Sequence, residues 1–147
     1  MPRDHRPAKS VRVLIAEDRS TTRGALALLL GMEDDIEVVA QVGRGDEIVD
    51  AALTRRPDVA LLDSELSGLS GVDAAAELRK EVPDCRVLIL TTFGRPGLLR
   101  GALEAGAAGL LVKDGPVEDL AQAIRRALTG ETVIDPVLAA AAEQGRP

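Results

Sequence analysis

The sequence predicts an α/β protein built on a doubly wound parallel sheet of five strands, with helices on both faces. Three observations lead to this prediction. Five short runs rich in Val, Ile and Leu alternate along the chain with five segments of helical spacing. Such alternation requires right-handed crossovers, which make successive strands parallel. The length of 147 residues and the 46% share of hydrophobic residues suit one domain with a substantial aliphatic core.

The alternation gives each element recognisable boundaries. The strands are predicted at about Val11 to Ala16, Ile36 to Val42, Val59 to Asp63, Arg86 to Leu90 and Gly109 to Val112. The helices are predicted at about Ser20 to Gly31, Asp46 to Arg56, Val72 to Glu81, Pro96 to Ala105 and Pro116 to Gly130. Proline or glycine stands at most of these helix boundaries, where it interrupts or caps the helical pattern.

The pattern within each segment indicates how it is buried. The run from Val59 to Asp63 is apolar up to its last residue, which predicts a strand buried on both faces. The run from Ile36 to Val42 alternates and is expected at an edge of the sheet. Ser20 is a candidate N-cap for the first helix. The residues expected to face the core are Leu26, Leu29 and Leu30 in the first helix and Ile48, Val49, Ala52 and Leu53 in the second.

Composition and charge exclude several classes of function. A formal net charge of −6 argues against nucleic-acid binding by this domain itself, because phosphate affinity comes chiefly from Lys and Arg. Phe93 is the single aromatic residue, so stacking on bases or sugars is essentially unavailable. The lone Cys85 excludes an internal disulfide and suits a reducing cytosol. No apolar run is long enough to cross a bilayer, so we expect a cytoplasmic protein without a membrane partner.

Three segments make up the expected domain organisation. Residues 1–10 form a polar leader without an apolar core, which we expect to be a disordered tail. Residues 11–130 hold the alternating strands and helices and form the folded domain. Residues 131–147 contain a Val-Ile pair, Asp135-Pro136 and an Ala-rich stretch. This last segment is expected to be the start of a linker to a further domain that the chain lacks.

Polar residues follow four of the predicted strands at one edge of the sheet. They are Glu17 and Asp18 after the first strand, Asp63 after the third, Thr91 after the fourth and Lys113 after the fifth. Ligands of open α/β sheets bind just beyond the carboxyl ends of the strands. These residues therefore predict a site at that edge.

The types of side chain at this edge favour phosphoryl chemistry. Clustered carboxylates repel one another, and a hard divalent cation such as Mg²⁺ relieves that repulsion. Asp63 would attack phosphorus, the metal and Lys113 would neutralise the phosphoryl oxygens, and a threonine hydroxyl would hold one of them. Spacing to the strand favours Thr91 over Thr92 for that hydroxyl. We therefore predict a phosphorylatable aspartate.

This joint pattern resembles the receiver domain of two-component response regulators over residues 11–130. Gly71, eight residues after Asp63, also fits the pattern. The resemblance implies a flavodoxin-like (CheY-like) (βα)5 fold with strand order 2-1-3-4-5. It also implies that Asp63 accepts the phosphoryl group, that Thr91 is the switch hydroxyl and that Lys113 contacts the phosphoryl oxygens.

The same resemblance implies how Mg²⁺ is held and which partners the protein has. Asp18 and Asp63 would bind the ion directly, Glu17 would act through water, and the backbone carbonyl of Glu65 would complete the protein ligands. The phosphoryl donor would be a sensor histidine kinase, and phosphorylation would produce a homodimer. No enzyme activity of its own is expected.

Finer details look like the NarL/LuxR group of response regulators. They are Glu-Asp-Asp at 33–35, Thr-Thr-Phe-Gly-Arg-Pro-Gly at 91–97 and Lys-Asp-Gly-Pro at 113–116. Within that group they are similar to regulators of membrane-lipid desaturation that answer a thermosensing kinase. Such proteins usually carry a C-terminal helix-turn-helix domain, so DNA binding is expected only through a domain beyond the linker at 131–147.

Four positions depart from the family pattern. Ser67 replaces a common proline and is expected to loosen the loop after the phosphoacceptor. Leu110 replaces a Tyr or Phe that rotates on activation, so a threonine and helix movement is expected instead. Asp114 replaces a proline with a cis bond, and a trans bond is expected because a non-proline cis bond costs about 3 to 4 kcal/mol. Glu65 places a carboxylate at the mouth of the site, where it either positions a water or slows phosphoryl entry.

The excess apolar surface of the first helix, together with the resemblance to receiver domains, indicates a dimer face that the first helix forms with the helix predicted at 116–130. The candidates are Leu28, Met32, Val117, Leu120, Ala121, Ile124 and Leu128. The alternative is that the residues of the first helix are scattered exposed apolar side chains, which are normal on protein surfaces.

Three other functions are compatible with parts of the pattern. A stand-alone receiver would act as a phosphorelay or as a phosphorylation-independent interaction module. A phosphatase or phosphotransferase with an aspartyl-phosphate intermediate would need a second acid close to its nucleophile, and Glu65 is the sole candidate. A nucleotide- or flavin-binding protein is disfavoured, because no Gly-rich loop follows the first strand.

Overall fold

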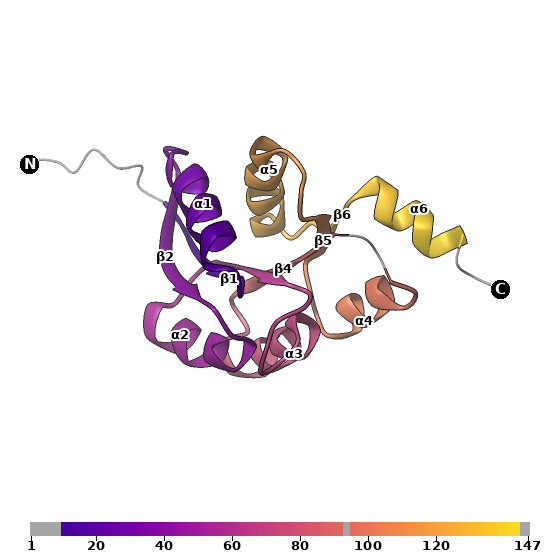
Figure 1. Cartoon of the computed structure of the whole chain (residues 1–147), viewed down its shortest axis with the longest axis horizontal. Helices are drawn as coiled ribbons and strands as arrows, with labels where there is room; N and C mark the ends of the chain where they lie inside the picture. Colours follow the sequence, from indigo (N-terminus) through magenta and orange to yellow (C-terminus); the bar gives the residue numbers. More distant parts are fainter. Residues whose placement is uncertain (1–9, 93–94, 145–147) are drawn as a thin grey trace, which may run out of the picture.

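The computed structural model describes residues 10–92 and 95–144, which form a parallel sheet of six strands between two layers of helices (Figure 1). Residues 1–9 of the expected disordered tail and the aromatic Phe93 lie outside the described residues. None of the described helices has the length and apolar character needed to span a membrane.

Every predicted strand and helix is present, within two residues of its expected boundaries. The strands are β1 (Val11–Ala16), β2 (Ile36–Val42), β3 (Val59–Asp63), β4 (Arg86–Thr91), β5 (Gly109–Val112) and β6 (Val133–Ile134). The helices are α1 (Ser20–Gly31), α2 (Ile48–Arg55), α3 (Gly71–Glu81), α4 (Leu98–Glu104), α5 (Val117–Leu128) and α6 (Pro136–Gln144), with a 3-10 turn η1 (Gly45–Glu47) before α2. The strand order is β2-β1-β3-β4-β5-β6, which confirms the expected order and places β2 at an edge.

The sheet has one strand more than predicted, because the segment after α5 returns to it. β6 pairs in parallel with β5, with Val133 opposite Gly109. A β-carbon on Gly109 would lie 2.2 Å from the carbonyl oxygen of Val133, so glycine allows this close approach of the two strands. Val133 and Leu138 are buried, and α6 packs against α4 and β5. Residues 131–144, which were expected to be the start of a linker, therefore pack on the domain and extend its core.

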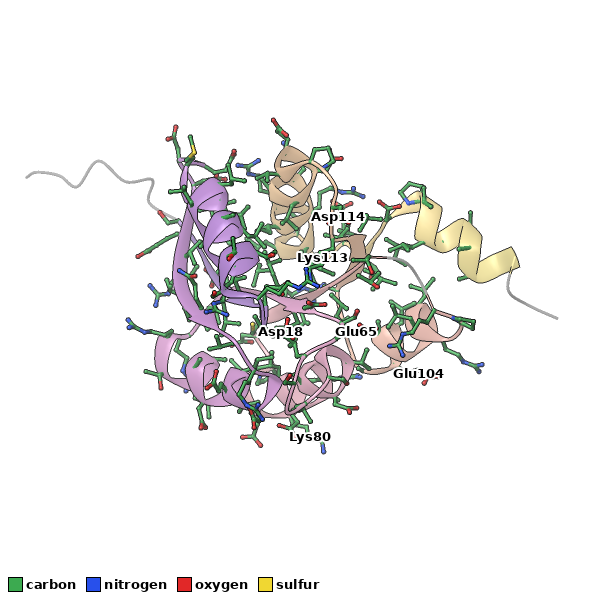
Figure 2. The ribbon with its side chains drawn as sticks, viewed as in Figure 1. Asp18, Glu65, Lys80, Glu104, Lys113 and Asp114 are labelled. Atoms are coloured by element: carbon green, nitrogen blue, oxygen red, sulfur yellow. The ribbon has the colours of Figure 1, made fainter. Side chains whose placement is uncertain are left out.

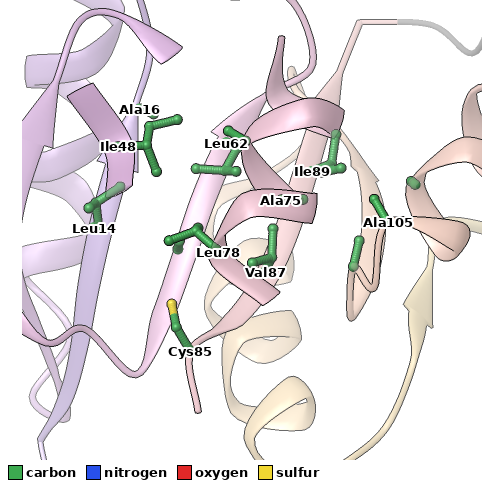
Figure 3. Close-up of a cluster of buried hydrophobic side chains, with 14 of the residues drawn as sticks. Leu14, Ala16, Ile48, Leu62, Ala75, Leu78, Cys85, Val87, Ile89 and Ala105 are labelled. Carbon is green, nitrogen blue, oxygen red and sulfur yellow. The ribbon is translucent and has the colours of Figure 1, made fainter. Parts of the chain in front are cut away.

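Aliphatic side chains alternate along the central strands and fill two cores, one on each face of the sheet. On one face Leu14 and Leu62 pack with residues of α2, α3 and α4, and on the other Val13 and Leu61 pack with residues of α1 and α5. Cys85 lies in the first core (Figure 3). Burial raises the pKa of its thiol to about 12, so the thiol stays protonated at neutral pH and acts as a packing residue.

Local details of the first two helices differ from the prediction. Ser20 is the first residue of α1, and the N-cap is Arg19, which makes no side-chain capping bond. Leu29 and Leu53 were expected to face the core, yet they are 44% and 37% exposed. A helix that lies on a sheet buries a narrow stripe. In α1 Leu30 occupies that stripe, and Leu29 falls beside it.

An arginine on α5 and two carboxylates just before β2 hold these two elements together. Arg125 on α5 donates from Nη2 to Glu33 Oε1 and Asp35 Oδ1, both at 2.7 Å, and from Nε to Asp35 Oδ2 at 2.8 Å. The guanidinium of Arg125 lowers the pKa of Asp35. This cluster fixes α5 next to the turn that follows α1.

The pair of Arg125 and Asp35 predicts a specific loss of stability in acid. Because the folded pKa of Asp35 lies below its ordinary 3.8, its contribution is complete above that value and disappears as the pH falls through the lowered pKa. The two side chains are 31% and 36% exposed, which limits the contribution to about 1 kcal/mol or less. Urea unfolding of the wild type and of Arg125→Met should differ by this amount at about pH 6 and converge near pH 2. A difference that is independent of pH would contradict this role for the pair.

Candidate functional site

Side chains from three strand ends meet at the carboxyl edge of the sheet, and a fourth strand ends there with Thr91. Glu17 and Asp18 follow β1, Asp63 and Thr91 end β3 and β4, and Lys113 follows β5. Asp18 and Lys113 lie together in the centre of the molecule, between the two helix layers (Figure 2). Glu17, Asp63 and Thr91 are buried, whereas Asp18 is exposed. The site therefore combines buried carboxylates with one exposed acid.

Lys113 joins the two buried carboxylates of the site. Its Nζ lies 2.5 Å from Glu17 Oε1 and 2.7 Å from Asp63 Oδ2. Burial raises the pKa of Glu17, and the hydrogen bond from Lys113 only partly opposes this. Burial alone would lower the pKa of Lys113, but the hydrogen bonds that its ammonium donates to Asp63 and Glu17 outweigh burial and raise the pKa. The lysine is therefore charged at neutral pH.

Glu17, Asp18 and Asp63 form an acidic group that could hold a cation. One carboxylate oxygen from each lies within 4.8 Å of the other two. Mg²⁺ prefers hard oxygen ligands and keeps several of its waters, and the exposed Asp18 leaves room for them. The three carboxylates carry more negative charge than the single ammonium of Lys113 neutralises, and a divalent cation would balance the rest. These residues therefore fit Mg²⁺. The backbone carbonyl of Glu65 stays a predicted ligand.

The loop that follows Asp63 begins with two tight local contacts. The backbone N–H of Glu65 donates to Asp63 Oδ1 at 3.1 Å. A β-carbon on Gly71 would lie 2.2 Å from the backbone oxygen of Asp63, so α3 can start this close to β3 only with glycine. The loop thus holds one oxygen of Asp63 while Lys113 holds the other.

The turn after β2 fastens the same loop from its other side. The backbone N–H of Gly45 donates to the carbonyl of Ser67 at 2.8 Å. A β-carbon on Gly45 would lie 1.7 Å from the carbonyl oxygen of Leu69, so the two backbones are in direct contact. Ser67 was expected to loosen this loop in place of a proline. The contact with Gly45 ties the backbone of Ser67 to the turn, and the looser loop stays a prediction.

The remaining predicted positions lie on β4 and β5 or directly after them. Thr91 is buried, Thr92 is exposed, and the backbone N–H of Lys113 donates to the carbonyl of Thr91 at 2.7 Å. These positions support Thr91 over Thr92 as the switch hydroxyl, a role that stays a prediction. Leu110 is buried in the core that α4 covers. The bond between Lys113 and Asp114 is trans, as expected, since no cis peptide occurs in the described part of the chain.

Arg23 contacts the site and was missed by the sequence analysis. Its Nη1 donates to the backbone carbonyl of Glu17 at 2.6 Å. An arginine in the first turn of α1, where acidic residues are usual, was the one available signal. That signal does not reveal which backbone group the guanidinium reaches.

The candidate dimer residues fall into three groups. Leu28, Met32 and Leu128 are exposed, and Val117 and Leu120 are half-buried. Ala121 and Ile124 are buried in the core beneath α5. The assignment of Ala121 and Ile124 to a dimer face is wrong, because the stripe of α5 that carries these two residues faces the sheet.

Comparisons with known proteins agree with the fold and the site. The sequence matches the response regulator receiver domain over residues 13–125. It is 44% identical over 128 residues to the transcriptional regulatory protein DesR of Bacillus subtilis, covering 87% of this chain and 63% of DesR. The signal receiver domain of the response regulator NarL from Mycobacterium tuberculosis is similar in structure, with a TM-score of 0.80 at 29% identity over 84% of this chain and 99% of that one. A LuxR-family response regulator from Aurantimonas sp. SI85-9A1 has a TM-score of 0.86 at 26% identity, covering 92% of this chain and 97% of that one.

The chain belongs to the response regulator receiver domain family, and its relatives are NarL/LuxR-type regulators. This confirms the resemblance that the strand-end residues indicated. Receiver domains bind Mg²⁺ at an acidic pocket, and this chain has an acidic group at the corresponding edge of its sheet. The chain spans 63% of the length of DesR.

Proposed function

We propose that this chain is the phosphoacceptor domain of a two-component response regulator and that Asp63 accepts the phosphoryl group from a sensor histidine kinase. The observation that carries this proposal is the bridge from Lys113 to the buried carboxylates of Glu17 and Asp63. An acid that merely capped a turn would not need a lysine shared with a second buried acid. The arrangement instead supplies a nucleophile, a fixed cation and a group able to hold a divalent metal.

The site residues divide the transfer between them. An oxygen of Asp63 forms a bond to phosphorus as the bond from phosphorus to the imidazole nitrogen of the kinase breaks, which gives an aspartyl phosphate and a free histidine. Lys113 neutralises negative charge on the phosphoryl oxygens, and the hydroxyl of Thr91 donates to one of them. Mg²⁺ held by Glu17, Asp18 and Asp63 would supply further neutralisation of that charge.

Phosphorylation from a small donor tests this proposal without the kinase. Incubation with acetyl phosphate and MgCl₂ should add one phosphoryl group, measured by intact-mass spectrometry, and EDTA in place of MgCl₂ should abolish the addition. Asp63→Ala should show no adduct, whereas Asp50→Ala, which removes an exposed acid of α2, should behave as the wild type. A wild-type protein that gains no phosphoryl group with Mg²⁺ would contradict the proposal.

We infer that phosphorylation acts by changing self-association and so controls a DNA-binding output domain. Leu28 on α1 and Met32 directly after it are 70% and 72% exposed. Helix α1 lies beside α5 (Figure 1), where Leu128 is also exposed. The net charge of −6 supports the proposal that DNA contact is made outside this domain. DesR is a transcriptional regulatory protein, and we propose transcription control through a helix-turn-helix domain that follows the segment at 131–147.

Self-association is testable by analytical ultracentrifugation with and without beryllofluoride. We expect a monomer that becomes a dimer when beryllofluoride and Mg²⁺ are present. The double variant Leu28→Ser, Met32→Ser should stay monomeric, because it removes the apolar surface of α1, while Leu103→Ser on the exposed face of α4 should dimerise normally. A monomer in both states at high concentration would contradict this part of the proposal.

A further inference from the structure

Arg23 carries a charge of the same sign as the cation that the neighbouring carboxylates could hold. It lies next to a group of three carboxylates that fits a divalent cation, so its charge alone would weaken metal binding. Within the described part of the chain Arg23 pairs with no carboxylate. Its guanidinium donates instead to the backbone carbonyl of Glu17 at 2.6 Å. Any favourable effect of Arg23 on metal binding must therefore come from this hydrogen bond and not from its charge.

Glu17 is held at both ends of its backbone unit and at both oxygens of its side chain. Its N–H donates to the carbonyl of Val42 at 3.1 Å, and its carbonyl accepts from Arg23. Oε1 contacts the ammonium of Lys113 at 2.5 Å, and Oε2 accepts from the backbone N–H of Arg19 at 2.9 Å. The carbonyl that Arg23 holds belongs to the peptide unit that joins Glu17 to Asp18. The orientation of that unit sets the direction of the exposed acid that follows.

The end of β2 leaves room for the guanidinium. A β-carbon on Gly43 would lie 3.0 Å from Arg23 Nη1, which is tighter than ordinary van der Waals contact. The guanidinium of Arg23 therefore lies directly beside the backbone of Gly43, and a side chain at this position would require it to shift slightly. The arginine is half-buried in this position, so a part of its hydration is exchanged for the bond to that carbonyl.

We propose that Arg23 is a positioning residue, which holds the peptide between Glu17 and Asp18 so that both carboxylates are oriented for Mg²⁺. This inference rests on the proposed metal site. The inference predicts the direction in which the Mg²⁺ affinity changes. Removing Arg23 weakens Mg²⁺ binding, although removing a positive charge near a cation site should otherwise strengthen it.

The test compares Mg²⁺ affinity in the metal-free wild type and in matched variants, by NMR titration of the backbone amides with MgCl₂. Arg23→Met keeps most of the apolar stem and removes the guanidinium. Arg19→Met is the control, because it removes an exposed charge from the same turn while its backbone N–H still donates to Glu17. Asp18→Ala reports the loss of a proposed ligand. Thermal unfolding without Mg²⁺ verifies that each variant folds.

We expect Arg23→Met to raise the Mg²⁺ dissociation constant about tenfold, the effect of one charge-assisted hydrogen bond, while Arg19→Met leaves it unchanged or lower. If Arg23→Met does not fold, Arg23→Lys carries the test, because it keeps the charge but not the planar donor, and its dissociation constant should rise about threefold. A variant of Arg23 that binds Mg²⁺ as tightly as the wild type would overturn this inference and leave the proposed function intact. A wild type that binds no Mg²⁺ would overturn the metal site itself.

Discussion

Replacing Lys113 with methionine is expected to destabilise the metal-free protein by about 2 to 3 kcal/mol at neutral pH. The reason is that Lys113 is the cation shared by Glu17 and Asp63, whose side chains are only 4% and 8% exposed. Without it, two carboxylates at the same strand ends lose their partner. Urea unfolding in the presence of EDTA measures this difference.

The pH dependence and the effect of Mg²⁺ identify the cause of that loss. Burial already raises the folded pKa of Glu17, so this residue costs stability as the pH rises through that pKa. Loss of the hydrogen bond from Lys113 raises the pKa of Glu17 further, so the difference between Lys113→Met and the wild type should grow as the pH rises above the ordinary glutamate value of 4.5. Added Mg²⁺ should narrow the difference, because a cation held by the same carboxylates replaces part of the missing charge.

Lys80→Met provides the control for the lysine prediction. Lys80 is an exposed lysine of α3 far from the strand ends (Figure 2), so its replacement should change stability by less than about 0.5 kcal/mol. Equal stabilities of Lys113→Met and Lys80→Met would mean that the bridge between the two carboxylates contributes nothing to the fold.

Replacing Gly71 with alanine is expected to cost about 3 kcal/mol and to slow phosphorylation. The new β-carbon would lie 2.2 Å from the backbone oxygen of Asp63 and 3.1 Å from Cα of Ser64. Neither atom belongs to a flexible side chain, so the start of α3 and the end of β3 must move apart. That movement displaces the aspartate that we propose as phosphoacceptor. Urea unfolding and the initial rate of acetyl phosphate labelling measure the two effects.

Gly24→Ala is the matched control for this substitution. A β-carbon on Gly24 meets nothing within 4 Å, and the residue lies inside α1. Alanine there should stabilise the protein by about 0.5 to 1 kcal/mol through helix propensity, with no change in the labelling rate. If Gly71→Ala behaved like Gly24→Ala, the close approach of α3 to Asp63 would not constrain the site.

The strand ends could be predicted from the sequence because each combines an apolar run with an abrupt change to polar residues. Asp63 after Val59 to Leu62 and Lys113 after Gly109 to Val112 are clear examples. Parallel strands then bring these ends to one edge without further information. The five main strands and the five main helices follow from the same local patterns.

The contacts that tighten the fold could not be predicted, because they depend on how distant backbones approach one another. Arg125 and Asp35 are separated by 90 residues in sequence. β6 has only two residues, too few for a strand pattern, and its pairing depends on the missing side chain of Gly109. The apolar stripe of α5 was visible in the sequence, but the sequence does not say whether the sheet or a second copy covers it. For Ile124 the sheet does.

The most direct measurement of the central claim is the location of the phosphoryl group in the chain. Labelling with acetyl phosphate and Mg²⁺, followed by reduction with borohydride, converts an aspartyl phosphate to homoserine, which peptide mass spectrometry can place. We predict homoserine at position 63, with Glu17, Asp18 and Glu65 unmodified. Modification at one of those three acids, or none at position 63 under conditions that label the intact protein, would contradict the assignment of Asp63 as the phosphoacceptor.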